Sequence, residues 1–474
     1  MSVLAIDAGT SRVRAVVVGE DARIRAERRR ELPPSHPAPG RVEFDAGELA
    51  EVALFLAREV LAEAGPVAAV GIANQRASTV VWERRSGTPV APAQGWQDLR
   101  TLPACATLAE RGLRLAPNQS APKLAGLLDA VDPRRASDLC FGTVDTWLAW
   151  RLSEGRLHVT DPSNASATGL LEDGVRWSTA RADALRIPAS VLPELVDSSG
   201  LLGPAGALPG APPLAGLAGD QQASLLGLGC VRPGDTKITF GTSAMLDTLV
   251  GDAPAYPGDL GDRGTFPIVA WRLSGETSFA LEASELCAGG CIEWLRELGV
   301  LGSAGESGEL AARCEDTGGV AFVPALVGLG TPFWDYGARG AFLGLTRGTG
   351  RPEIARAVLE GVACRTADLI EAVEGDAGRA IPTLRVDGGM TDNETFLQVV
   401  ADATGRRVEV SPEREATALG AAFLAGRAVG LWPDAEAVAR TWQPRVELEP
   451  RGRPDRARWH EALARARGSG GSAC

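Results

Sequence analysis

The sequence predicts an α/β fold with more than one domain. Three observations carry this prediction: strand-like and helix-like segments alternate, two Gly-Thr turns each follow a strand, and 474 residues are too many for one hydrophobic core. Residues 46–64 have the helical spacing of apolar side chains, whereas 67–72 and 80–82 are short apolar runs typical of strands. The expected buried face of the helix comprises Leu49, Val52, Ala53, Leu56 and Val60.

Composition narrows the class of protein further. Hydrophobic residues make up 45% of the chain and charged residues 23%, as in globular proteins, and the net charge of −12 disfavours nonspecific nucleic-acid binding. No segment resembles a signal peptide, and no apolar run approaches the ~18 residues that span a membrane. We therefore expect a cytoplasmic protein with neither nucleic acid nor membrane as a partner.

The eight cysteines suggest free thiols. They form no disulfide-rich framework for a chain of this length, and none has Cys-x-x-Cys spacing. Cys287 and Cys291 lie four residues apart and would share one face of a helix. We expect buried thiols there rather than a metal site.

The two Gly-Thr turns are the first candidates for chemistry. One follows the apolar segment 3–8 and continues into 14–18, and the other follows 237–240 and continues into 245–250. Either turn alone could be an ordinary β-hairpin. A Gly-Thr turn also lets backbone approach a phosphate closely, so a pair could hold one polyphosphate from both sides. Asp7 would then supply a carboxylate for a Mg²⁺ ion on the phosphates.

Two later motifs place polar or flexible residues at the end of a strand. Asp220 stands between the apolar segment before Gly219 and an expected helix, where it could cap that helix or take a proton from an alcohol as a general base. Asp387-Gly388-Gly389 ends a second strand and precedes a helix through 396–403. Backbone without side chains could lie close to an adenosine there.

The domain boundary is expected where the composition loosens. Residues 200–216 are rich in Gly, Pro and Ala and suggest a surface excursion, and the composition loosens again at 227–234. We therefore expect an N-terminal domain over 1–228, a C-terminal domain over 229–467 and a flexible tail over 468–474.

Ordered motifs over almost the whole length resemble the FGGY family of carbohydrate kinases. They are Asp7-x-Gly9-Thr10 with Arg14, Asn74-Gln75-Arg76, Trp96-Gln97-Asp98-x-Arg100-Thr101, the segments 141–148, 158–161 and 164–166, Gly219-Asp220-Gln221-Gln222, Gly241-Thr242, the segment 328–334, and a C-terminal signature from 340–345 to 357–360. Within the family, the chain is most similar to members that phosphorylate glycerol.

The resemblance implies a two-domain fold of the actin and ribonuclease H type, with ATP and the active site in the cleft between the domains. The matching positions for the nucleotide are Thr10, Ser11, Arg14, Thr242, Gly289, Glu293, Gly389 and Asn393. By the same resemblance Asp7 would hold the Mg²⁺ ion and Asp220 would be the catalytic base. The reaction would be in-line transfer of the γ-phosphoryl group of ATP to an alcohol.

The acceptor pocket departs from the family pattern. Arg76, Trp96, Asp220 and Gln221 match positions that bind the polyol. Ala77 stands where family members acting on glycerol have Glu, and Asn118 aligns with a pocket Tyr. Losing one charged hydrogen bond costs ~1.5–3 kcal/mol, which is enough to change substrate preference.

Three functions therefore stay open at this point. The first is a glycerol-phosphorylating enzyme with an altered pocket, and the second is a kinase for a larger polyol or a ketose. The third is a non-catalytic actin-like regulator, which would have no physical need for both Asp7 and Asp220. A homo-oligomer is possible in each case.

Overall fold

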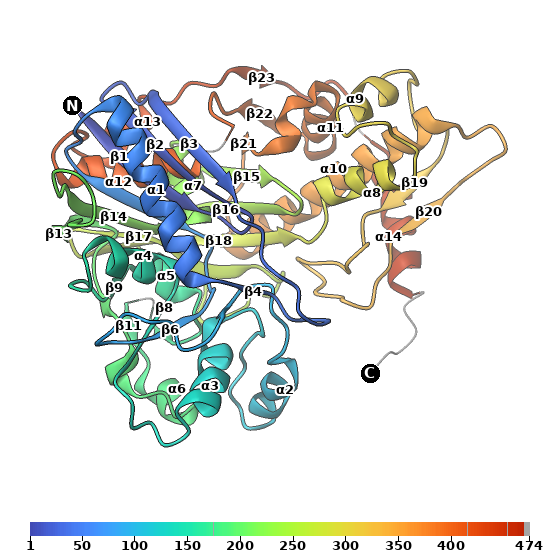
Figure 1. Cartoon of the computed structure of the whole chain (residues 1–474). Helices are drawn as coiled ribbons and strands as arrows, with labels where there is room; N and C mark the ends of the chain where they lie inside the picture. The colour runs from blue at the N-terminus through green and yellow to red at the C-terminus, as the bar shows by residue number, and fades with distance from the viewer. Residues whose placement is uncertain (174, 415, 453, 469–474) are drawn as a thin grey trace. The chain divides into compact units, whose positions relative to one another are not determined.

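The computed structural model describes residues 1–173, 175–414, 416–452 and 454–468 (Figure 1). These residues form two compact units. Unit 1 comprises Met1–Gly229, Ile268–Ser278 and Ala416–Thr441, and unit 2 comprises Cys230–Pro267, Phe279–Glu415 and Trp442–Cys474 as far as these are described. Among the described helices, none is both long and apolar enough to cross a membrane.

The first unit ends its main segment one residue after the expected boundary at 228, but it also takes in two later segments that the sequence had assigned to the C-terminal domain. Helix α12 (Thr417–Ala428) is the larger of these, and it packs on strands of unit 1. Of the expected flexible tail, Gly468 is the last residue of helix α14, and 469–474 lie outside the described residues.

A twisted set of five strands forms the centre of unit 1, in the order β3–β2–β1–β5–β14. Their bounds are Ile24–Glu31, Arg12–Gly19, Ser2–Ala8, Val70–Asn74 and Pro213–Gly219. Strand β2 runs antiparallel to both β1 and β3, and β1, β5 and β14 run parallel. Strand β13 (Ser199–Pro204) pairs with β14, so part of the expected surface excursion is a strand.

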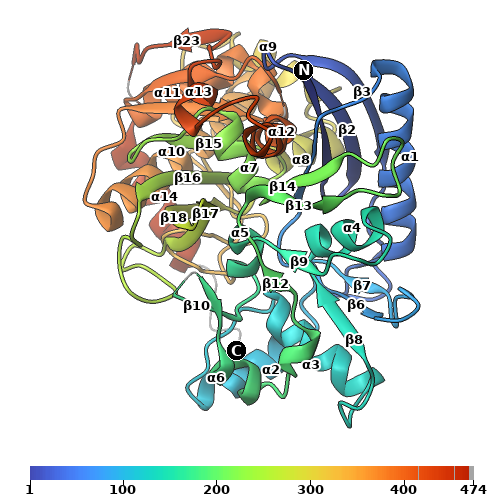
Figure 2. The same ribbon diagram turned by 90° about the vertical axis from the view of Figure 1, so that its left-hand side faces the viewer.

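Helices cover both faces of this sheet. Helix α1 (Ala46–Ala64) has the bounds expected from the sequence and lies against β2 and β3, with all five expected apolar residues buried. Asp45 caps its start by accepting a hydrogen bond from the backbone N–H of Glu48 at 3.0 Å. Helix α12 contacts β1, β5 and β14, and Figure 2 shows α1 and α12 on opposite sides of the strands.

Helix α12 also fixes α7 (Asp220–Gly227), the helix that begins at the candidate base. The two helices approach so closely at Gly420 that a Cβ atom there would lie 1.8 Å from the carbonyl oxygen of Ala223. A side chain at Gly420 would therefore displace the start of α7 from the sheet.

Unit 2 repeats the strand order of unit 1. Strands β18–β16–β15–β21–β22 have the bounds Glu276–Glu285, Ala244–Gly251, Thr236–Phe240, Thr383–Asp387 and Arg407–Val410. Strand β16 runs antiparallel to both β15 and β18, and β15, β21 and β22 run parallel. This repetition is the two-domain α/β architecture that the family resemblance implied.

The other elements complete the two units. In unit 1 they are β4 (Glu43–Phe44), β6 (Val80–Glu83), β7 (Ala93–Gln94), α2 (Leu102–Glu110), α3 (Ser120–Val131), β8 (Leu139–Gly142), α4 (Val144–Leu152), β9 (Val159–Thr160), α5 (Pro162–Ser166), β10 (Leu171–Glu172), β11 (Arg176–Trp177), α6 (Thr179–Ala184), β12 (Glu194–Leu195) and α13 (Ala435–Ala439), with most of β17 (Phe266–Leu273). In unit 2 they are α8 (Gly289–Glu297), α9 (Glu306–Ala311), β19 (Ala321–Val323), β20 (Ala341–Leu343), α10 (Arg351–Ala377), α11 (Glu394–Thr404), β23 (Val446–Leu448) and α14 (Arg456–Gly468).

Candidate active site

Three parallel strands of unit 1 end in one row. Ala8 of β1 is in register with Asn74 of β5, and Asn74 is in register with Gly219 of β14. The residues that follow these ends therefore lie at one edge of the sheet, where ligands of open α/β sheets usually bind. They are the first Gly-Thr turn, Gln75-Arg76 and Asp220-Gln221.

The first Gly-Thr turn connects β1 to β2 as a tight hairpin. The Gly9 N–H donates to the carbonyl of Arg12 at 3.0 Å, and Thr10 and Ser11 are at least partly accessible. Asp7 is half-buried two residues before Gly9, in register with Arg14. Arg14 itself is 6% exposed, and its Nε donates to Glu27 Oε1 of β3 at 2.9 Å. The hairpin is thus present, and binding of phosphate by these residues stays a prediction.

The segment after β5 lies against this turn. The Gln75 backbone N–H donates to the Ala8 carbonyl at 2.9 Å, and its Nε2 donates to the Gly9 carbonyl at 3.3 Å. Trp96 also contacts the turn, since its Nε1–H donates to Thr10 Oγ1 at 2.9 Å. The Trp96 side chain is 36% exposed and so presents an apolar surface beside the turn.

Arg76 and Asp220 form an ion pair at the same edge. Arg76 Nε lies 3.4 Å from Asp220 Oδ1, and the two side chains are 13% and 28% exposed. Gly219 makes this approach possible, because a Cβ atom there would lie 2.6 Å from Arg76 Cγ and Cδ. A partly accessible carboxylate and a guanidinium thus lie together beside the turn.

Both sequence-based interpretations of Asp220 stay open. Asp220 is the first residue of α7, and its Oδ1 accepts the N–H of Gln221 at 2.9 Å, so it does satisfy one of the N–H groups that begin a helix. Gly219 occupies the cap position itself. This local bond leaves room for a second role, because a carboxylate has about four acceptor positions.

The two positions that depart from the family pattern, Ala77 and Asn118, differ in exposure. Ala77 is 7% exposed with a φ of 60°, and its carbonyl accepts from Ser120 Oγ at 3.0 Å. Asn118 is exposed, and its carbonyl accepts from Lys123 Nζ at 2.9 Å.

Lys123 also donates to the carbonyl of Gly95, directly before Trp96, at 3.0 Å. Complete burial lowers the pKa of Lys123 to about 7, although the charge of Asp98 opposes this shift.

In unit 2 the second Gly-Thr turn meets the start of α8. Thr242 is exposed, and its carbonyl accepts N–H groups from Ala288 at 2.8 Å and Gly290 at 3.0 Å. Gly289 donates to the Gly241 carbonyl at 3.0 Å, and a Cβ atom at Gly289 would lie 2.6 Å from that oxygen. Thr242 and Gly289 are therefore brought together.

Glu293 lies one turn further along α8 and is exposed. It accepts a hydrogen bond from Arg296 Nε at 2.8 Å, and this bond lowers the pKa of Glu293. The expected buried thiols are confirmed: Cys287 and Cys291 are buried and free, with their Sγ atoms 3.5 Å apart. Only Cys291 lies within α8, because the helix begins at Gly289.

The Asp-Gly-Gly motif follows β21 as expected. Gly388 has a φ of 96°, and a Cβ atom there would lie 2.4 Å from the carbonyl oxygen of Phe240. Gly389 faces open space, since nothing lies within 4 Å of a Cβ atom built on it. Asn393 caps α11 by accepting the Phe396 N–H at 2.9 Å, and its Nδ2 donates to Ser307 Oγ at 3.2 Å.

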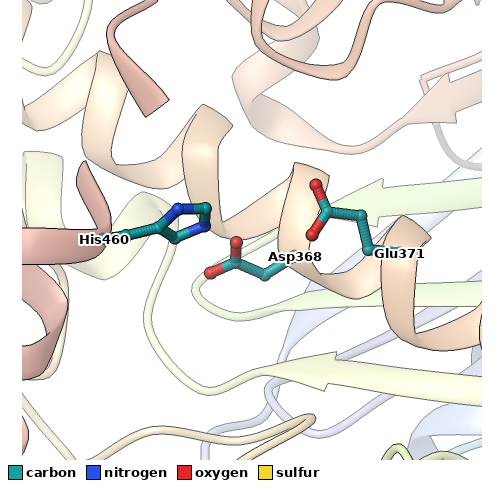
Figure 3. Close-up of side chains that lie close together, drawn as sticks. All are labelled: Asp368, Glu371 and His460. Atoms are coloured by element: carbon teal, nitrogen blue, oxygen red, sulfur yellow. The ribbon is translucent and has the colours of Figure 1, made fainter. Parts of the chain in front are cut away.

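A separate cluster of possible metal ligands in unit 2 is better explained as an ion-pair network. Asp368 and Glu371 of α10 lie near His460 of α14 (Figure 3). Arg456 Nη2 contacts Asp368 Oδ1 at 2.8 Å and Glu371 Oε1 at 2.9 Å, and Arg365 contacts Asp368 Oδ2 at 2.9 Å. Two guanidinium groups already neutralise these carboxylates, so a cation would gain little there.

Comparison with known proteins identifies the family. The N-terminal domain of the FGGY family of carbohydrate kinases matches residues 2–227, and its C-terminal domain matches residues 236–429. The chain therefore belongs to the FGGY family of carbohydrate kinases, whose members are phosphotransferases with an alcohol as acceptor.

Individual relatives match over nearly the full length. A glycerol kinase of Trichlorobacter lovleyi is 43% identical, covering 98% of this chain and 99% of its own. The crystal structure of Plasmodium falciparum glycerol kinase with ADP has a TM-score of 0.91 and 27% identity, covering 98% of each chain. A xyloylose kinase from Brucella ovis has a TM-score of 0.84 and 26% identity, covering 99% of this chain and 98% of its own.

Proposed function

We propose that this protein transfers the γ-phosphoryl group of ATP to a hydroxyl of glycerol, giving glycerol 3-phosphate. The observation that carries the proposal is the row of strand ends in unit 1, which brings the Asp220–Arg76 pair to the edge that bears the first Gly-Thr turn. Similarity to glycerol kinases over nearly the whole chain supports glycerol as the acceptor.

Asp220 would act as the general base. Its carboxylate is partly accessible and held at the start of α7, so it can accept the proton of an acceptor hydroxyl as the phosphoryl group is transferred. Arg76 would donate hydrogen bonds to the acceptor and keep the base oriented. Gln221 would add a polar contact, and Trp96 would provide the apolar wall of the pocket.

Each unit contains residues that match the family's ATP-binding positions. Thr10, Ser11 and Arg14 are assigned to the phosphates in unit 1, and Thr242 to the phosphates in unit 2. Gly289, Glu293, Gly389 and Asn393 are assigned as further contacts to the nucleotide, and the open space over Gly389 supports the assignment of Gly389.

A Mg²⁺ ion fits the residues at the end of β1. Asp7 is the one half-buried carboxylate within that strand, next to the proposed phosphate turn, and Mg²⁺ prefers carboxylate and phosphate oxygens. The ion would neutralise charge on the phosphates when bound. Asp7 would hold it directly or through water.

A kinase for a larger polyol or a ketose is the second candidate function. It is favoured by Ala77, where a small buried side chain replaces the family's Glu, and by Asn118 in place of a Tyr. The non-catalytic alternative is disfavoured, because the chain belongs to a kinase family and both Asp7 and Asp220 are in place.

The test is an acceptor panel with the purified protein. ADP formation should be measured by a coupled assay with glycerol, tetritols, pentitols and ketoses at saturating MgATP. The proposal predicts glycerol-dependent ADP formation with the highest kcat/KM for glycerol. A higher kcat/KM for a longer polyol or a ketose would favour the second candidate, and no activity on any acceptor would refute both.

A further inference from the structure

A buried polar network in unit 1 is hydrogen-bonded to the residues that precede Asp220 and Arg76. Its centre is Asp161, which follows β9 and caps the short helix α5. Asp161, Ser163, Asn164, Ser198 and Asn74 are each 0% exposed. Neither the proposed chemistry nor the pocket uses any of these five side chains.

The Asp161 carboxylate is held by five donated hydrogen bonds. Oδ1 accepts from Ser163 Oγ at 2.8 Å, from the Asn164 N–H at 3.0 Å and from Asn164 Nδ2 at 3.0 Å, and Oδ2 accepts from the Ser163 N–H at 3.2 Å and from Ser198 Oγ at 2.6 Å. Burial raises the pKa of Asp161, and the donors oppose that rise. All five of these hydrogen bonds are donated to the carboxylate, and this arrangement favours its ionised form.

One branch of the network leads to the candidate base. Ser163 Oγ donates to Asp161 and accepts the N–H of Gly219 at 2.9 Å. Gly219 immediately precedes Asp220 at the end of β14. The Asp161–Ser163 bond therefore fixes the backbone from which the Asp220 carboxylate projects.

The second branch leads to Arg76. Asn164 Nδ2 donates to Asp161, and Asn164 Oδ1 accepts from Asn74 Nδ2 at 2.9 Å. Asn74 Nδ2 also donates to the carbonyl of Gln75 at 3.0 Å, one residue before Arg76. The Asp161 carboxylate is thus connected through one side chain, Ser163, to the N–H of the residue before Asp220. Through two side chains, Asn164 and Asn74, it is connected to the carbonyl of the residue before Arg76.

We propose that Asp161 is a positioning residue for phosphoryl transfer, acting through Ser163 on Asp220 and through Asn164 and Asn74 on Arg76. The inference rests on the proposed function, because it needs Asp220 to act on the acceptor. Its physical basis is that proton transfer and in-line attack tolerate little displacement, while buried side chains held by several hydrogen bonds resist displacement.

The chain offers a matched pair of variants for the test. Ser163 and Ser198 are both fully buried, and the hydroxyl of each donates to Asp161. They differ in what the hydroxyl accepts: Ser163 accepts from Gly219 beside the base, whereas Ser198 accepts from the Arg272 N–H of β17 at 3.1 Å. Ser163→Ala and Ser198→Ala therefore remove the same kind of bond to the same carboxylate, and only Ser163→Ala loosens the base.

The experiment measures kcat and KM for glycerol at saturating MgATP, ATP affinity by isothermal titration calorimetry, and the thermal midpoint. Ser163→Ala should lower kcat ~10-fold or more, while Ser198→Ala should keep kcat within about twofold of wild type, because a small misplacement of reacting groups slows transfer steeply. Both variants should lose similar thermal stability and keep wild-type ATP affinity. Asp161→Asn, which turns an NH₂ group toward the donors, should lower kcat by ~10²-fold.

Equal losses of kcat in Ser163→Ala and Ser198→Ala would overturn the inference, because the network would then only stabilise the fold. An unchanged kcat in Ser163→Ala would overturn it as well. If Asp161→Asn does not fold, the two serine variants still decide. A wild-type protein that phosphorylates no polyol would instead refute the proposed function, so the two failures are distinguishable.

Discussion

The two units have one strand order but place different residues at the ends of their parallel strands. In unit 1, Arg76 and Asp220 follow the ends of β5 and β14 and supply a guanidinium and a partly accessible carboxylate. In unit 2, Gly388-Gly389 follows the end of β21, and the backbone at Gly389 faces open space. The same topology therefore offers reactive side chains in one unit and a surface for close ligand approach in the other.

The acidic residues near the strand ends of the two units also differ in their exposure to solvent. The Asp220 side chain is 28% exposed, whereas Asp387 in unit 2 is 2% exposed and accepts a hydrogen bond from Thr239 Oγ1 at 2.6 Å. Two residues before the glycine of each turn, unit 1 has the half-buried Asp7 and unit 2 has Thr239. We infer that unit 1 carries the chemistry and that the acidic group of unit 2 supports its structure.

The largest expected effect comes from neutralising the candidate base. Asp220→Asn should lower kcat ~10²–10⁴-fold, because no group then accepts the proton of the acceptor. The matched change in unit 2, Asp387→Asn, should lower the thermal midpoint and leave kcat at saturating ATP close to wild type. Steady-state kinetics and thermal unfolding of both variants check this contrast. A near-normal kcat in Asp220→Asn would mean that Asp220 only supports the start of α7.

The candidate metal ligand should give the next largest effect. Asp7→Ala should raise the Mg²⁺ concentration needed for half-maximal rate and slow transfer ~10-fold or more, because the ion compensates the charge of the transferring group. Thr239→Ala, at the equivalent position of unit 2, should leave the Mg²⁺ requirement unchanged. Rates measured against Mg²⁺ at fixed ATP separate the two variants, and an unchanged requirement in Asp7→Ala would remove Asp7 from the metal site.

The acceptor pocket should respond to restoring the missing acidic group. Ala77→Glu should raise kcat/KM for glycerol ~10-fold, the scale of one charge-assisted hydrogen bond. The same change should lower kcat/KM for larger polyols because it fills volume. The two effects have opposite sign, so paired kinetics with glycerol and a pentitol test them together. If glycerol is already used efficiently and Ala77→Glu has no effect, another residue supplies the contact.

The smallest expected effect is a pH dependence of the free energy of unfolding that arises from one of the two buried lysines, Lys123. Lys237 in unit 2 lies 2.7 Å from the Asp247 carboxylate, whereas Lys123 in unit 1 donates to backbone carbonyls. Because the pKa of Lys123 falls from 10.5 to about 7 on folding, the unfolded chain binds more protons between these pH values. Wild-type stability should therefore rise with pH in this window, relative to Lys123→Met, by roughly 1 kcal/mol per pH unit.

Denaturant unfolding of wild type and Lys123→Met at several pH values between 7 and 9 measures this difference. A difference that stays constant with pH would show that Lys123 keeps its charge in the folded protein.

The sequence was sufficient for much of the fold. Helix α1 was predicted with its correct bounds, because its apolar residues follow the helical period without interruption. The Gly-Thr turns and the strand end before Asp220 were also correct, since each combines an apolar run with a turn signal. Strand β13 was missed inside 200–216, because Gly- and Pro-rich composition hides a strand whose pairing is set by β14.

Parts of the candidate site could not be predicted for a different reason. The Arg76–Asp220 pair and the Trp96–Thr10 bond join residues far apart in the chain. The register of β5 and β14 brings Arg76 and Asp220 together, and the bond from Trp96 likewise forms only in the folded chain. Asp161, Asn164 and Asn74 belong to motifs of the family resemblance, but the sequence predicts no role for them, because their hydrogen bonds form only in the folded chain. The return of α12 to unit 1 likewise depends on helix packing at Gly420.

Unit 1 is proposed to carry the reactive groups, and unit 2 is proposed to contact the nucleotide at Gly389. The ATP affinity of two variants, measured side by side, tests this proposal most directly. Asp220→Asn changes the chemistry proposed for unit 1, and Gly389→Val fills the space proposed for the nucleotide in unit 2. Isothermal titration calorimetry should give Asp220→Asn an ATP Kd within about twofold of wild type. Gly389→Val should have a Kd raised ~10-fold or more, which corresponds to a loss of about 1.4 kcal/mol or more of binding free energy. Wild-type affinity in Gly389→Val together with weakened binding in Asp220→Asn would contradict the account.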